Sequence, residues 1–135
     1  MIRTLVRDEP SQVATMLQLI EDLPAHVVGV RAVNAVTEED YKQVLTPALE
    51  ALDKSIGRIN LIIVLETSVS NYTVGAWAND LKAGFKYFNK WHRIAIVSDQ
   101  KMVRKFTDAF NFIAPGEYKG FSMAELSIAK QWVAA

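Results

Sequence analysis

The stretch Ile59-Asn-Leu-Ile-Ile-Val-Leu65 decides the fold, because six of its seven residues are apolar. A strand with apolar side chains on both faces is typical of the middle of a parallel sheet that helices cover on each side. Gly57 precedes the stretch and a polar run follows it from Glu66. We therefore expect residues 59–65 to form a central strand.

Before this strand, the pattern predicts a hairpin and a helix. Residues 15–20 and 27–33 have strand patterns and are separated by the turn Glu21-Asp-Leu-Pro24. The helix opens at Thr37, a capping residue that is followed by three acids, which suits the positive end of a helix dipole. Pro47 lies inside this helix and is expected to bend it.

After the central strand, helices and strands alternate. We expect helices at about 74–89 and 98–110, strands at 93–97 and 117–121, and a last helix that the capping box Ser122-Met-Ala-Glu125 opens. The predicted order is β-β-α-β-α-β-α-β-α, an α/β fold with a mixed, mainly parallel sheet. Residues 16–135 then form one domain, and residues 1–15 are expected to be an extension or a loose strand.

Composition narrows the function classes. The 135 residues hold 15 basic and 15 acidic side chains, and this balance argues against general nucleic-acid binding. The charge is unevenly spread, with six basic and ten acidic residues in 1–73 but eight and four in 74–120. Cysteine is absent, which fits a cytoplasmic location, and no apolar run approaches the ~20 residues that span a bilayer.

Several stretches along the chain resemble the SpoIIAA-like family, which is also described as STAS/SEC14-like. They include Leu23-Pro-Ala-His-Val-Val-Gly-Val-Arg-Ala32, Val36-Thr-Glu-Glu-Asp-Tyr41, Trp77-Ala-Asn-Asp-Leu-Lys82 and Phe112-Ile-Ala-Pro-Gly-Glu117. The resemblance covers about residues 16–135. Relatives of this fold include anti-sigma-factor antagonists, domains of anion transporters and lipid-holding proteins, so it implies binding or switching more than catalysis.

In the anti-sigma-factor antagonists, a serine that accepts phosphate lies after the central strand in an Asp-Ser-Ser/Thr-Gly setting. This chain has Ser68-Val-Ser-Asn-Tyr-Thr73 there. Ser68 and Ser70 are candidate phosphorylation sites by position, but the motif itself is missing. The simpler interpretation is a polar loop with capping residues.

No catalytic or metal-binding constellation is visible in the sequence. His26 and His92 are the only histidines and have no partner at ligand spacing. Glu38, Glu39 and Asp40 are accounted for by the start of a helix. We therefore predict no enzyme activity, no catalytic residue, no metal and no cofactor.

The predicted second and third helices carry the candidate binding residues. On the second helix, apolar residues including Trp77, Leu81, Phe85 and Phe88 share one side, while Lys82, Lys86 and Lys90 form a stripe on the other. One interpretation is an ordinary core helix; the other is a lid over an apolar pocket or a helix on a membrane surface. The third helix adds six further candidate residues: Lys101, Arg104, Lys105, Phe106, Phe110 and Phe112.

Ile113 follows these residues, and the apolar end of the third helix can either join the core or protrude as an anchor. The main hypothesis is a non-enzymatic domain for an apolar or lipid-like ligand. In it, Trp77, Leu81, Phe85, Phe88, Phe106 and Phe110 line the pocket, and the basic residues with Phe112 and Ile113 face an anionic membrane. The alternative is a cytoplasmic interaction module that regulates a protein partner or forms a homodimer.

Overall fold

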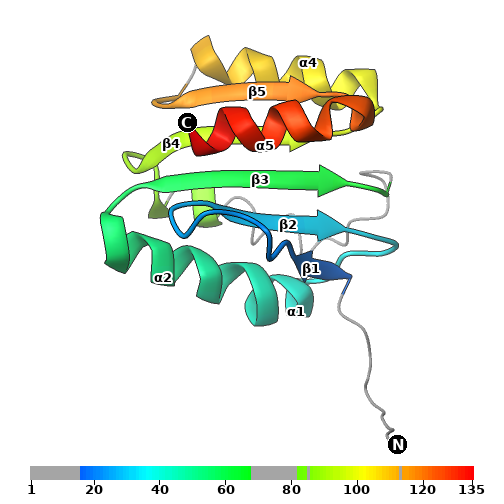
Figure 1. Ribbon diagram of the computed structural model, residues 1–135. Helices are drawn as coiled ribbons and strands as arrows, with labels where there is room; N and C mark the ends of the chain where they lie inside the picture. Colours follow the sequence, from blue (N-terminus) through cyan, green and yellow to red (C-terminus); the bar gives the residue numbers. More distant parts are fainter. Residues whose placement is uncertain (1–15, 68–81, 85, 113) are drawn as a thin grey trace, which may run out of the picture.

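The computed structural model describes residues 16–67, 82–84, 86–112 and 114–135. Its sheet has five strands in the order β1-β2-β3-β4-β5 (Figure 1). The strands are β1 (Leu17–Leu19), β2 (Val28–Ala32), β3 (Ile59–Leu65), β4 (Trp91–Val97) and β5 (Glu117–Phe121). β1 pairs with β2 in antiparallel orientation and the other pairs are parallel. The predicted mixed α/β sheet, the hairpin and the central position of residues 59–65 are confirmed.

Helices cover both faces of the sheet, and we call these the first and the second face. Three consecutive helical segments pack on the first face against β2 and β3: α1 (Glu38–Asp40), η1 (Tyr41–Leu45) and α2 (Thr46–Ile56). Helix α4 (Lys101–Ala109) and the short turn η3 (Phe110–Phe112) lie beside β4 and β5. The second face is covered by η4 (Met123–Glu125) and α5 (Leu126–Ala134), and α5 contacts β3 and β4.

Side chains of β3 alternate between two apolar cores. Leu61 and Leu65 join the first core, which α2 completes with Leu49 and Leu52. Ile62 and Val64 join the second core together with two buried residues of α5. The continuous apolar run of β3 is thus explained by burial on both of its faces.

The helix around Pro47 has an unexpected form. Its start is as predicted, since Thr37 and Asp40 form a capping box. Residues 41–45 then form a π-helical turn, and the regular helix resumes at Thr46, with Pro47 in its first turn. Pro47 thus stands where the π-helical and α-helical segments join, and it lacks the N–H that would continue the backbone hydrogen bonds there. The sequence predicted a bend at Pro47; the irregularity found is a π turn that ends two residues before it.

The second predicted helix, 74–89, lies mostly outside the described residues. Residues 82–84 and 86 are helical, and residues 87–90 form a turn that leads into β4. Among the helices that the structure describes, none is long and apolar enough to cross a membrane.

Candidate functional site

Helix α4 lies unusually close to the edge strand β5. A Cβ atom built on Gly120 would be 2.7 Å from Cα of Arg104 and 2.9 Å from its carbonyl oxygen, so the helix backbone occupies the space of a side chain. Thr107 is the only buried residue of α4, and its hydroxyl donates to the carbonyl of Val103 at 2.8 Å. The missing side chain of Gly120 therefore leaves room for the backbone of α4 at Arg104 to lie against β5.

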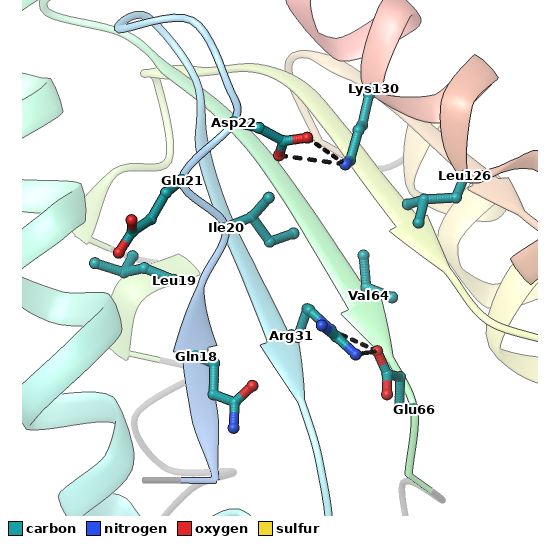
Figure 2. A pocket seen from close by; sticks show the side chains of 10 residues that line it. All are labelled: Gln18, Leu19, Ile20, Glu21, Asp22, Arg31, Val64, Glu66, Leu126 and Lys130. Atoms are coloured by element: carbon teal, nitrogen blue, oxygen red, sulfur yellow. Dashed lines mark hydrogen bonds and ion pairs between the residues drawn. The ribbon is translucent and has the colours of Figure 1, made fainter. Parts of the chain in front are cut away.

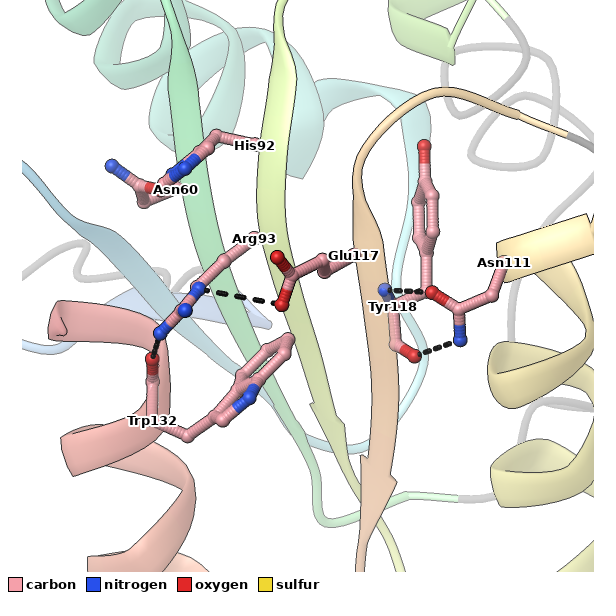
Figure 3. Close-up of polar contacts among 7 residues, drawn as sticks. All are labelled: Asn60, His92, Arg93, Asn111, Glu117, Tyr118 and Trp132. Carbon is pink, nitrogen blue, oxygen red and sulfur yellow. Dashed lines mark hydrogen bonds and ion pairs between the residues drawn. The ribbon is translucent and has the colours of Figure 1, made fainter.

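Polar side chains hold α4 and η3 to the outer side of β5 (Figure 3). The amide of Tyr118 donates to Oδ1 of Asn111 at 2.8 Å, and Nδ2 of Asn111 donates to the carbonyl of Tyr118 at 2.6 Å. The amide of Gly120 donates to Oδ1 of Asp108 at 2.8 Å. These side chains take the place of a further strand, which blocks pairing at this edge of the sheet.

The outward side of α4 carries two adjacent rows of residues. Lys101 and Lys105 are four residues apart and both exposed, as are Met102 and Phe106 in the neighbouring row. Met102 is 78% exposed, Phe106 67% and Phe112, at the end of η3, 91%. Neither lysine makes an ion pair with any described residue. We call Lys101, Met102, Lys105, Phe106 and Phe112 the α4 surface.

An aromatic chain connects this surface to the sheet. The rings of Phe106 and Phe110 meet edge to face with centroids 5.0 Å apart, and Phe110 lies 5.6 Å from Tyr118 of β5. Partial burial raises the pKa of Tyr118, whose hydroxyl donates to the carbonyl of Pro115 at 2.7 Å. Phe110 is therefore a half-buried support for Phe106.

The basic residues predicted on the two helices have different surroundings. Arg104 donates from Nη1 to the carbonyl of Ser98 at 2.7 Å, so it is turned toward the end of β4. Lys90 pairs with Asp53 of α2 at 2.7 Å, and Lys86 pairs with Glu50 at 3.3 Å. The hydrogen bond that Lys86 donates to Glu50 is the main reason that the pKa of Lys86 is raised. Lys82 and Phe88 are exposed.

Six predicted site residues lie outside the described residues: Ser68, Ser70, Trp77, Leu81, Phe85 and Ile113. The predicted pocket beneath the second helix and the candidate phosphorylation sites therefore stay predictions.

The two histidines belong to one hydrogen-bonded group, which the sequence did not predict. The side chain of Asn60, which Figure 3 shows beside His92, accepts from Nδ1 of His92 at 2.7 Å. It also donates to the carbonyl of His26 at 3.0 Å. Nε2 of His26 in turn donates to the carbonyl of Ala134, near the end of α5, at 2.8 Å. The partner of His92 is a carboxamide, and a carboxamide does not accept a proton in the way that a general base does.

Burial lowers the pKa of His92, and the nearby Arg58 and Arg93 lower it further. Arg93 also donates to the carbonyl of Trp132 at 2.8 Å and lies over the Trp132 ring. The group thus anchors the end of α5 to the sheet. Within the described residues, no three histidine, aspartate or glutamate side chains are grouped as metal ligands.

Taken together, the fold and this surface define a small α/β domain whose described part presents an exposed helix face. The SpoIIAA-like family matches residues 27–134, and the chain belongs to that family. This match confirms the resemblance seen in the sequence.

A solved structure has the same fold. It is the crystal structure of an uncharacterized protein from the DUF3478 family, with a SpoIIAA-like fold, from Shewanella loihica PV-4. The two chains are 26% identical with a TM-score of 0.61, over 87% of this chain and 91% of the other. No curated protein matches the chain.

Proposed function

We propose that this protein is a non-enzymatic binding domain that attaches reversibly to anionic membranes through the α4 surface. The observation that carries the proposal is the exposure of Met102, Phe106 and Phe112 beside two lysines that form no ion pair with a described residue. Amphipathic helices that lie in the headgroup layer have this combination of apolar and basic side chains.

The charge of this segment favours an anionic partner. Residues 101–112 contain Lys101, Arg104 and Lys105 against Asp108 alone, a net charge of +2. Asp108 is bonded to the amide of Gly120, and Arg104 to the carbonyl of Ser98. The charges that point outward are therefore those of the two lysines.

Typical magnitudes indicate that the apolar residues supply most of the attachment. Full burial of a Met or Phe side chain contributes about 1.5–3 kcal/mol, whereas each basic residue near an anionic bilayer contributes about 1 kcal/mol. The three apolar side chains thus outweigh the two lysines. The lysines select anionic lipid and make the binding depend on salt concentration.

A protein partner or a second copy of the chain is the other class of occupant for an exposed apolar face. Lysine is depleted at the core of protein interfaces, although Met and aromatic residues are enriched there. A lysine row directly beside the apolar row therefore favours a lipid headgroup layer. The regulatory-module hypothesis depends on the loop of residues 68–73, and the predicted apolar pocket on Trp77, Leu81 and Phe85; both lie outside the described residues.

The test is co-sedimentation with vesicles of phosphatidylcholine alone and of phosphatidylcholine with phosphatidylglycerol. We expect binding to the anionic vesicles only, weaker at high salt. Phe106→Ala with Phe112→Ala should reduce it at least tenfold, and Lys101→Gln with Lys105→Gln about thirtyfold at low salt.

Matched controls are Ile128→Ala, an exposed apolar residue of α5, and Lys54→Gln, an exposed lysine of α2. Both should leave binding unchanged. Absence of binding to anionic vesicles, or equal loss in the controls, would contradict the proposal. Self-association that Phe106→Ala abolishes, without vesicle binding, would instead identify a second copy as the occupant.

A further inference from the structure

A groove of about 540 Å³ lies on the second face of the sheet, the face that α5 covers (Figure 2). One wall is the segment that follows β1, the other is α5, and the floor is formed by β2 and β3. The volume is within the range of about 300–1,000 Å³ that is typical of small-molecule sites. None of the site residues predicted from the sequence lines it.

The wall that follows β1 depends on a glycine in β2. A Cβ atom built on Gly29 would lie 2.4 Å from Cδ1 of Leu23 and 2.9 Å from Cγ2 of Ile62. The segment of residues 20–23 therefore packs directly on the sheet. It brings Ile20 and Asp22 to the edge of the groove, where Figure 2 shows them facing α5.

The groove has an apolar middle between two ion pairs. Side chains of Ile20, Val64 and Leu126 lie in the middle. Arg31 pairs with Glu66 at one end. At the other end, Nζ of Lys130 contacts both carboxylate oxygens of Asp22, at 3.3 and 3.1 Å.

The second of these pairs is asymmetric. The side chain of Lys130 is 28% exposed, whereas that of Asp22 is 71% exposed. Lys130 is thus fixed in the wall. The Asp22 carboxylate is already largely hydrated, so it can turn away from Lys130 into water at little cost. Exposed pairs of this kind are weak, so another carboxylate can replace that of Asp22 at small cost.

We propose that the groove binds a small carboxylate with an apolar tail. Lys130 takes the ligand carboxylate, the tail lies along Ile20, Val64 and Leu126, and Asp22 is an internal competitor for the same ammonium group. Arg31 is paired with Glu66, the more buried of the two residues, and closes the end of the groove opposite Lys130. This site is separate from the membrane-binding surface and does not depend on it.

The probe is hexanoate, titrated into ¹⁵N-labelled protein and followed by amide chemical shifts, with hexan-1-ol and hexylammonium at the same chain length. We expect hexanoate to shift the amides around residues 20–22 and 126–130, and to bind more tightly than the other two. Lys130→Gln should weaken hexanoate binding at least fivefold. Asp22→Asn should strengthen it roughly two- to fivefold, the size expected from removing an exposed ion pair.

Loss of structure would weaken hexanoate binding in both variants, whereas the proposal expects Lys130→Gln to weaken it and Asp22→Asn to strengthen it. Lys42→Gln removes a lysine that is paired with Glu38 on α1 and controls for net charge. The proposal would be overturned by equal binding of hexan-1-ol, by unchanged affinity in Asp22→Asn, or by a loss in Lys42→Gln as large as that in Lys130→Gln. Vesicle binding should be unaffected by either groove variant.

Discussion

Helices α4 and α5 have the same length of nine residues but relate to the sheet in opposite ways. Helix α5 buries Ala129 and Val133 completely in the second core. Helix α4 buries only Thr107 and exposes Met102 and Phe106. The hydrophobic effect therefore fixes α5, whereas α4 is held largely by backbone contact and polar side chains at an edge strand.

The ends of the two helices differ in the same sense. The last carbonyls of α5 accept hydrogen bonds from His26 and Arg93, which satisfy groups that a helix end leaves without partners. Helix α4 continues into η3, which ends on the exposed Phe112. The comparison teaches that Met102 and Phe106 of α4, unlike Val103, which packs against the first core, are not needed for the fold, and exposed apolar surface of this kind is where a binding function is expected.

The largest expected effect comes from removing apolar volume from α5 rather than from α4. Val133→Ala should lower the free energy of unfolding by about 2 kcal/mol, since it removes buried methyl groups and leaves a cavity. Met102→Ala on α4 should change it by less than about 0.5 kcal/mol, as expected for an exposed helix position. Urea denaturation of both variants measures the difference; equal losses would mean that α4 is as much a part of the core as α5.

A smaller effect is expected at the polar attachment of α4. Asn111→Ala removes both hydrogen bonds to Tyr118 and should lower the free energy of unfolding by about 1 kcal/mol. It also uncovers the backbone of β5, so light scattering should show more aggregation on storage. Asn111→Asp keeps the acceptor for the Tyr118 amide, so its free energy of unfolding should lie between those of the wild type and Asn111→Ala. Unchanged stability and solubility in Asn111→Ala would show that other contacts protect the edge of the sheet.

Much of the fold is predictable because its signals are local. The apolar run 59–65 identifies β3, and the capping residues Thr37 and Ser122 mark two helix starts. Each depends on burial or hydrogen bonding within a few residues. The π turn before Pro47 was missed because helical periodicity does not separate a π turn from an α turn over five residues.

The surface and the groove were less predictable because they depend on distant neighbours. Helical spacing groups the aromatic residues of α4, yet it does not show which side is buried. Gly120 lets the helix backbone at Arg104 approach β5, and Phe106 is left exposed. Asp22 and Lys130 are 108 residues apart. No sequence pattern joins such pairs, and only the sheet and the position of α5 bring them together.

The smallest expected effect concerns pH and the anchoring of α5. The folded pKa of His92 lies below its ordinary value of 6.5, so the unfolded chain binds this proton more readily. The contribution of neutral His92 to the free energy of unfolding is then complete above about pH 6.5 and declines as the pH falls toward the folded pKa. Stability therefore rises with pH in this window. His92→Gln should remove that part of the slope in the free energy of unfolding between pH 5.5 and 7.5. A slope unchanged in His92→Gln, or a wild-type stability that falls as the pH rises through this range, would show that the histidine group does not link the end of α5 to protonation.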